Sequence, residues 1–540
     1  MRYDKRIREG DLPGNSGIPK VLTAKPGGED VAVFPEEMVK QMVCPKGRGG
    51  GEKSHILAAC SRRKHIAANI IGFGLLLVLG AVSLAGCGNG DSGSSESEKH
   101  TPHDAIKLVG ETASESYLKI SSTIEGEAAV SVTEGGCLAL HDATIWKIGD
   151  EASSLPDGRG GVRGGQPPGA RGRPEPRTEA GGPQQSPGPP ENANPGPGAT
   201  HAGVYAGSRG TISLSNVSIE TAEWEGQGLY ASGEGSSITL VNGTITTDGR
   251  SAYGVFATHK GAVAVENVTI ITRGEHSSAL ATFRGNGTVT AVGGTYTAFG
   301  KYSSGIFSAG DISVSGVICK SVLDRAAVLE GGSRITLKDS ILWSQEKGGV
   351  LICQSFSSDV LVGPSRFEMT GGSVSSDDGP LFYVTNTAGL IFLKQVDLYA
   401  PSGILLEALK GEWRADLVWH KPVKGGTVTL VAENQILSGD IIVDEFSSVI
   451  ATLKNGTTLT GAVNTDDQGK DVRLTLDATS TWRVTADSHI TSLTFYDGVS
   501  DAGITNITGN GHTVFYDEAA SPALGGKTYD LPKGGKLMPK

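Results

Sequence analysis

The amino-acid sequence predicts an all-β protein, a repetitive coil of short strands that follows an N-terminal membrane signal or anchor segment. Two observations predict the coil. The chain has 78 glycines and only 6% aromatic residues, which suits short strands and tight turns. A six-residue pattern also recurs about every 25 residues, a spacing typical of solenoids. The membrane segment is predicted by an apolar run of 21 residues that ends at a cysteine.

The first 65 residues differ in charge from the rest of the chain. Residues 1–65 contain 13 Lys/Arg against 8 Asp/Glu, whereas the remainder has a net charge of −16. Because residues 1–65 show no clear hydrophobic periodicity, we expect them either to be disordered or to precede the true translation start. The acidic remainder would repel nucleic acid, so we expect no nucleic-acid partner.

Residues 66–87 form the predicted signal or anchor. A basic cluster at 61–65 precedes the uncharged run, as in an export signal. The run ends in Leu84-Ala85-Gly86-Cys87, which resembles the lipobox of bacterial lipoproteins. This resemblance implies that a lipid is attached to Cys87 and that the protein lies on the extracytoplasmic face of the cell membrane. The alternative is an uncleaved transmembrane helix that serves as a single-pass anchor.

Residues 88–104 are rich in Gly, Ser and Glu and are expected to form a flexible tether between the anchor and the coil. Such a tether would hold the following domain away from the membrane.

The repeat is clearest in a column of residues that tolerate a left-handed backbone. Successive segments such as LSNVSI (214–219), LVNGTI (240–245) and VENVTI (265–270) align on their third position. Eight of the nine residues in this column are Asn, Asp or Gly, which favour a bend between two strands. The column contains Asp142, Asn216, Asn242, Asn267, Gly293, Gly316, Asp339, Gly371 and Gln395.

Apolar residues flank this column on both sides. The position two residues earlier is apolar in every repeat, as are nearly all positions three residues later, from Ile145 and Ile219 to Leu398. A second phrase, such as GVYA (203–206) or GLYA (228–231), recurs between these segments and supplies a further strand. Stacking of the turns would bury these columns in one narrow core.

This pattern resembles the right-handed parallel β-helix of the pectin-lyase-like superfamily and of autotransporter passenger domains. The resemblance covers about residues 105–515. It implies the fold more strongly than an activity, because the superfamily includes lyases, hydrolases, adhesins and tail spikes. Segments 425–463 and 471–495 keep the strand alternation but lose the column, so we expect differently bent turns there. Residues 516–540 are expected to form a C-terminal tail or cap.

An insertion interrupts the coil at residues 153–201. It contains 11 of the 24 prolines and five arginines but almost no apolar residues. We therefore expect a disordered or polyproline loop. It is either a tolerated surface insertion or a basic arm that reaches cell-wall polyanions.

The sequence contains no recognisable catalytic or metal-binding motif. The acidic pairs Asp377-Asp378 and Asp466-Asp467 are expected in solvated turns, and Asp324-Arg325 has no second acidic residue at the matching position one turn away. His259 and His276 lack metal-ligand spacing. We therefore predict no catalytic residue, no metal and no cofactor.

Three tryptophans that follow the column are the candidate ligand-binding residues: Trp146, Trp224 and Trp343. They could stack on sugars, although packing against a neighbouring turn is the alternative. We expect a membrane-anchored, surface-exposed protein that is adhesin-like or binds glycans or cell-wall polymers without catalysis. The alternative is an exported polysaccharide lyase or glycoside hydrolase of the pectin-lyase-like superfamily.

Overall fold

The computed structural model describes residues 105–149, 201–355, 360–411, 424–496 and 503–540. The predicted extension at 1–65, the signal or anchor at 66–87 with Cys87, the tether at 88–104 and the insertion at 153–200 lie outside these residues. Within the described ranges, no helix has both the length and the hydrophobicity needed to cross a membrane.

Twelve short strands form the first sheet, and every pairing in it is parallel. In sheet order they are β1 (Ile106–Val109), β4 (Val130–Thr133), β7 (Val204–Gly207), β9 (Leu229–Ser232), β11 (Val255–Thr258), β13 (Leu280–Phe283), β15 (Ile306–Ser308), β18 (Ala327–Glu330), β20 (Val350–Cys353), β22 (Phe382–Thr385), β25 (Ile404–Ala408) and β28 (Asp440–Val443).

The second sheet contains the strands that follow in each turn, several of which are bent and 11 or 12 residues long. They are β2 (Thr112–Ser116), β3 (Lys119–Ser122), β5 (Cys137–His141), β6 (Thr144–Lys147), β8 (Thr211–Thr221), β10 (Ser237–Thr247), β12 (Ala262–Thr272), β14 (Thr288–Ala298), β16 (Asp311–Ser315), β17 (Ile318–Ser321), β19 (Arg334–Ser344), β21 (Ser365–Ser376), β23 (Ala388–Lys394), β24 (Asp397–Tyr399), β26 (Thr427–Glu433), β29 (Ser448–Lys454), β31 (Asp471–Leu476) and β34 (Ser492–Phe495).

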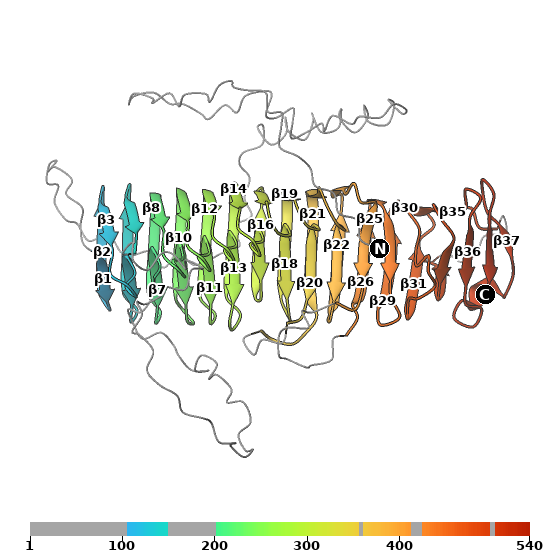
Figure 1. Ribbon diagram of the computed structural model, residues 1–540, viewed down its shortest axis with the longest axis horizontal. Helices are drawn as coiled ribbons and strands as arrows, with labels where there is room; N and C mark the ends of the chain where they lie inside the picture. Colours follow the sequence, from blue (N-terminus) through green and yellow to red (C-terminus); the bar gives the residue numbers. More distant parts are fainter. Residues whose placement is uncertain (1–104, 150–200, 356–359, 412–423, 497–502) are drawn as a thin grey trace, which may run out of the picture. The chain divides into compact units, whose positions relative to one another are not determined.

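These two sheets confirm the predicted all-β parallel β-helix. A short strand of the first sheet leads into a long strand of the second, and the chain then returns to the first sheet one strand position further on (Figure 1). Each turn therefore pairs in parallel with the previous one through hydrogen bonds that run along the coil axis. For example, β8, β10 and β12 pair without a register shift over their lengths.

The left-handed column is present at every predicted position. All nine residues have a positive φ between 47° and 68°, including Gln395 at 55°. The expectation that segments 425–463 and 471–495 lose this column was wrong for the first, because Asn434 and Asn455 continue it with φ values of 46° and 56°. It holds for the second, where the next position of the column, Ala478, does not have a positive φ. Ala432 and Leu437 keep the apolar flanks of Asn434, so the sequence carried this signal, whereas the polar Thr458 takes the second flanking position after Asn455.

The flanking apolar columns form the core. Leu214, Leu240 and Val265 pair in register, as do Ile219, Ile245 and Ile270, and all six side chains are buried. Every predicted member of both columns is buried except the last, Leu398, which is partly buried. Identical positions in successive turns therefore build one continuous hydrophobic interior.

Buried hydroxyl groups close the corner where the second sheet returns to the first. Thr221 and Thr247 occupy the last positions of β8 and β10, and their Oγ1 atoms donate to the carbonyls of Gly226 and Ala252. Thr272 of β12 donates to Ser277 in the same way. Each bond satisfies a buried hydroxyl and holds in place the loop that leads to the next strand.

The C-terminal part contains two small sheets and a short 3₁₀ helix, η1. Residues 516–540, expected to be a tail or cap, contain β37, β38 and η1, and β37 pairs with β38 in the antiparallel direction. The elements are β27 (Ile436–Ser438), β30 (Thr458–Thr460), β32 (Thr481–Arg483) and β35 (Ile507–Thr508), then β33 (Ser488–Ile490), β36 (Thr513–Tyr516), η1 (Pro522–Leu524), β37 (Tyr529–Asp530) and β38 (Lys536–Pro539).

Candidate functional site

The candidate site is the outer surface of the strand segments that follow the left-handed column, which we call the lateral face. It is formed by β3, β6, β17 and β24 together with the C-terminal halves of the long strands. Successive side chains alternate between the core and this face. One outward row is rich in hydroxyl groups and contains, in register, Thr144, Ser218, Thr244, Thr269, Thr295, Ile318, Ile341, Ser373 and Asp397.

A second outward row contains most of the aromatic residues of this face. Trp146 and Trp343 lie in it six strand spacings apart, about 29 Å at ~4.8 Å per strand. Tyr399 follows two positions further on. The complete row is Ser121, Trp146, Glu220, Thr246, Ile271, Thr297, Lys320, Trp343, Ser375 and Tyr399.

The third candidate tryptophan lies outside these rows. Trp224 is in the loop after β8, and 61% of its surface is exposed. The structure thus places two of the three predicted tryptophans in one row and the third elsewhere. The sequence alone could have predicted this difference. Trp146 and Trp343 both lie four residues after the left-handed residue of their turn, whereas Trp224 lies eight residues after it.

Two contacts fix side chains on the lateral face. The Lys320 Nζ lies 4.0 Å from the centroid of the Trp343 ring, a cation–π arrangement that places a positive charge beside the indole. The hydroxyls of Ser218 and Thr244 are 2.7 Å apart and form a hydrogen bond between turns. Donors and acceptors of this face are therefore held on a rigid, regularly spaced scaffold.

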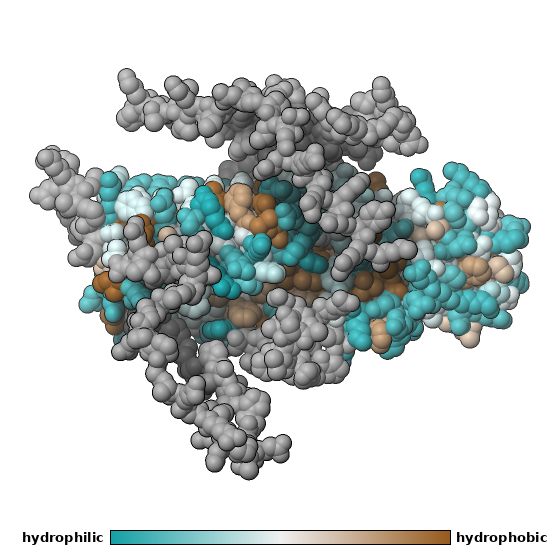
Figure 2. All heavy atoms as spheres, viewed as in Figure 1, coloured by the Kyte–Doolittle hydropathy of each residue, from teal (hydrophilic) through white to brown (hydrophobic). Residues whose placement is uncertain are grey.

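The outer face of the first sheet carries a different row, which the sequence reasoning did not assign to a site. The rings of Tyr205 and Tyr230 are 5.3 Å apart, and those of Tyr230 and Phe256 are 5.0 Å apart. Further along the coil, Figure 2 shows a hydrophobic band over the region of β18, β20 and β22. Tyr205 and Phe256 are only 5% and 8% exposed, and burial raises the pKa of Tyr205 to about 12. The recurring GVYA phrase, with its aromatic third residue, is the signal that could have revealed this row.

A group of ionisable residues lies on the same face near Arg325. The Arg325 guanidinium is 5.5 Å from the centroid of the Tyr383 ring, and burial raises the pKa of the Glu330 and Glu407 carboxyls. Asp324 pairs with Lys347 at 3.5 Å. A carboxyl with a raised pKa can serve as a general acid. Glu330 is buried, however, and hydrogen bonds from Ser355 partly offset the rise in its pKa, which fits a structural role.

Arg325 thus has an acidic neighbour, Glu407, that the sequence reasoning did not identify. The electrostatic interaction of Arg325 with Glu407 lowers the pKa of that carboxyl, although burial remains the larger effect. Glu407 lies on β25, several turns after Asp324, so a search for a partner one turn away could not find it.

The other acidic and histidine candidates occupy turns. Asp378 Oδ1 accepts a hydrogen bond from the amide of Gly379 at 2.8 Å, and Asp467 pairs with Lys540. The ring of His276 stacks on Tyr302 with centroids 4.9 Å apart. Among the described residues, no group of three or more His, Cys, Asp or Glu is placed to hold a metal ion.

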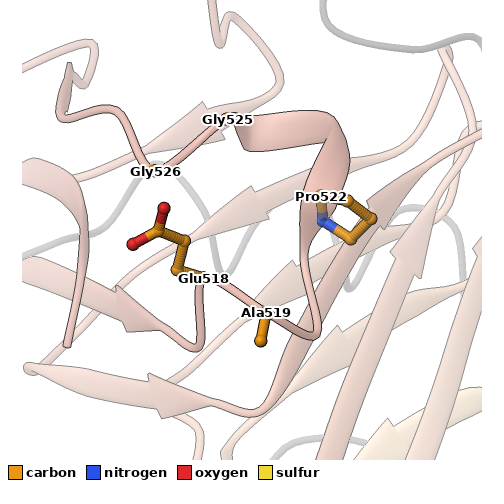
Figure 3. Close-up of a pocket in the computed structure, with 5 residues that line it drawn as sticks. All are labelled: Glu518, Ala519, Pro522, Gly525 and Gly526. Atoms are coloured by element: carbon orange, nitrogen blue, oxygen red, sulfur yellow. The ribbon is translucent and has the colours of Figure 1, made fainter.

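A shallow cavity lies beside η1 near the C-terminus. Figure 3 shows the carboxylate of Glu518 near Gly526, with Ala519 and Pro522 on the opposite side. Its volume is about 520 Å³, and its lining offers one charged group. This lining does not suggest a ligand.

The chain is similar to a known autotransporter. The BrkA autotransporter of Bordetella pertussis (strain Tohama I) is 27% identical over 285 residues. The match covers 51% of this chain and 26% of the relative, so the similarity spans about a quarter of that protein. No family model matches the chain. No solved structure matches it significantly.

The chain is a parallel β-helix protein similar to an autotransporter. This agrees with the resemblance to autotransporter passenger domains that the repeat pattern indicates.

Proposed function

We propose that this protein is a membrane-anchored, surface-exposed β-helix that binds glycans or cell-wall polymers through its lateral face without catalysis, in the manner of an adhesin. The observation that carries this proposal is the pair of outward rows, in which hydroxyl groups repeat over four successive turns, from Ser218 to Thr295, between Trp146 and Trp343. Extended faces of this kind are the surfaces that solenoid proteins use for binding. The similarity to the BrkA autotransporter supports surface exposure.

The chemistry of the lateral face suits a neutral, extended polymer. Thr244, Thr269 and Thr295 each present a hydroxyl that can donate and accept hydrogen bonds. Indole rings supply large apolar contact areas with few rotatable bonds, which makes them effective anchors in binding surfaces. A polysaccharide lying along the coil axis would meet a hydroxyl group at each of the four turns from Ser218 to Thr295.

The second candidate function is that of an exported polysaccharide lyase or glycoside hydrolase. The group formed by Arg325, Glu330 and Glu407 favours it, because a basic residue and carboxyls of raised pKa occur at such active sites. We favour binding because Glu330 is buried and hydrogen-bonded to Ser355. Release of products from bound glycans distinguishes the two functions.

Replacing Trp343 by alanine is expected to weaken glycan binding about tenfold or more, because truncating a central aromatic anchor costs on the order of 2 kcal/mol. Trp146→Ala should have a similar effect. The measurement is binding of the full-length protein and its variants to a glycan array, followed by titration calorimetry with the strongest ligand.

Trp224→Ala is the matched control for this experiment, since Trp224 is exposed but lies outside the row. It should bind like the wild type. Bound polygalacturonate, pectin, alginate and host glycans should remain intact by mass spectrometry, with or without calcium. Product release that stops in Glu330→Gln would favour the enzyme, and equal losses from all three tryptophan variants would refute the lateral face as the binding surface.

We also propose that a lipid on Cys87 anchors the protein, on the basis of the sequence Leu84-Ala85-Gly86-Cys87. Mass spectrometry of protein purified from membranes should find an acylated Cys87 at the mature N-terminus. Cys87→Ser should retain the full precursor without the lipid mass. An unmodified chain that still contains residues 66–86 would instead indicate the single-pass transmembrane anchor.

A further inference from the structure

A second cavity lies at the corner where the chain passes from the first sheet to the second, in the C-terminal part of the coil. Its volume is about 660 Å³. We call it the corner cavity. The residues used in the following argument are Gln354, Asn386, Lys424, Glu445, Phe446 and Lys470, all of which line it.

Successive turns of the coil contribute one short segment each to this cavity. Ala388, Thr427, Ser448 and Asp471 are paired in register on β23, β26, β29 and β31. The segments that precede these strands are therefore stacked on one another, and they contain the lining residues. The starts of these four strands span three strand spacings along the coil axis, about 14 Å at ~4.8 Å each.

Gln354, which lines the corner cavity, carries an unsatisfied polar atom. Its side chain is 9% exposed, and its Nε2 donates to the carbonyl of Ser355 at 3.2 Å. Its Oε1 is buried and has no hydrogen-bond partner. A buried acceptor without a donor is unfavourable, so a ligand that donates a hydrogen bond to this oxygen would be stabilised.

Asn386 holds the surrounding backbone in place. Its Nδ2 donates to the carbonyl of Gln354 at 2.6 Å, and its Oδ1 accepts from the amide of Lys424 at 3.0 Å. Asn386 has a φ of 57°, a left-handed conformation that asparagine tolerates. The positions of Gln354 and Lys424 are thus fixed relative to each other before a ligand binds.

Two lysines give the corner cavity a positive charge. Neither Lys424 nor Lys470 has an ion-pair partner among the described residues, and Glu445 is the only acidic residue of the described lining. Lysines without a partner are suited to bind a carboxylate or a sulfate.

Phe446 adds an apolar surface, of which 46% is exposed. Its amide donates to Asp444 Oδ1 at 3.2 Å, while Asp444 Oδ2 accepts from the amide of Lys410 at 2.6 Å. The Lys410 Nζ lies 4.2 Å from the centroid of the Phe446 ring. The ring is therefore held in position, with a further positive charge beside it.

We propose that the corner cavity binds a saccharide unit that carries an acidic group. Its carboxylate or sulfate contacts the ammonium groups of Lys424 and Lys470, a ring hydroxyl donates to Gln354 Oε1, and the sugar ring packs against Phe446. A phosphate ion alone would use the lysines but would leave both Gln354 and Phe446 without a role. This site does not share residues with the lateral face and stands independently of its function.

The test is titration calorimetry of the full-length protein with three tetrasaccharides: a sulfated one derived from heparin, a carboxylated one of galacturonic acid, and neutral maltotetraose. We expect at least one acidic tetrasaccharide to bind through Lys424 and Lys470, whereas any binding of maltotetraose to the lateral face should not depend on these lysines. Lys424→Gln combined with Lys470→Gln should weaken binding at least tenfold and reduce its dependence on salt. Gln354→Met should weaken it several-fold while keeping that dependence.

Lys338→Gln is the matched control, because Lys338 is an exposed lysine on β19 away from the corner cavity. It should bind the acidic tetrasaccharide like the wild type. Circular dichroism should show that each variant remains folded. The proposal is overturned if neither acidic tetrasaccharide binds, if the double lysine variant leaves acidic binding unchanged, or if Lys338→Gln has the effect of the double variant.

Discussion

Replacing Ile270 by aspartate is expected to unfold several turns of the coil. Ile270 is fully buried in β12 and lies in register with Ile245 and Tyr296. Its Cγ2 atom would lie only 2.4 Å from a Cβ added at Gly254, so the surrounding packing leaves no space for water. A carboxylate there would lack a partner, and we expect a loss of about 4 kcal/mol or more in the free energy of unfolding.

Urea unfolding of the full-length protein, followed by far-UV circular dichroism, measures this loss. Ile219→Asp should behave similarly, because Ile219 lies two turns earlier in the same column. Thr269→Asp is the matched control: Thr269 is adjacent to Ile270 but faces outward on the lateral face. A Thr269→Asp variant that is as unstable as Ile270→Asp would contradict the assignment of core and surface.

Removing the carboxylate of Glu223 is expected to have the second large effect. Lys147 is fully buried, and its Nζ donates to Glu223 Oε1 at 2.6 Å and to the carbonyl of Ile124 at 2.8 Å. Glu223 Oε2 lies 2.9 Å from His201 Nδ1. Glu223→Ala leaves a buried ammonium without its counterion, which should destabilise the protein by about 3–5 kcal/mol.

The same unfolding measurement tests this prediction. Glu220→Ala removes an exposed glutamate from β8, three residues before Glu223, and should change stability little. Because a buried ion pair can be replaced by apolar residues at little cost, Lys147→Met combined with Glu223→Leu should recover most of the loss. A double variant as unstable as Glu223→Ala would indicate that Lys147 is not the cause.

The architecture was predictable because stacking imposes the same demand at the same position of every turn. A bend that requires a left-handed residue selects Asn, Asp or Gly, as at Asn216, Asn242 and Gly293. The positions on either side of the bend must be apolar, because stacking places them in the core in every turn. The column could also have been traced to Asn434, which Ala432 and Leu437 flank as in the earlier turns, whereas Thr458 breaks the apolar pattern after Asn455 although the backbone does not change.

Contacts between distant residues of different type were harder to predict. Lys147 lies five residues after its column residue, an inward position that Thr221 and Thr247 occupy in later turns. A charged residue at an inward position signals a buried partner. Its identity could not be derived from spacing, because Glu223 lies 76 residues away, beyond the insertion.

The binding surfaces were predictable to different degrees. Counting from the column places Trp146 and Trp343 in one row, since every turn has the same backbone there. The corner cavity depends on segments of irregular length between the sheets. Gln354 and Lys470 therefore show no common spacing, and only the folded chain brings them to one cavity.

The direction of the hydrogen bonds between turns has a mechanical consequence. Because these bonds run along the coil axis, a force that pulls the two ends of the coil apart along that axis acts on one turn at a time. The bonds would break in sequence, as in a zipper, rather than together, as in strands that are sheared past one another. Such a molecule would lengthen stepwise under load, each step releasing the residues of a single turn.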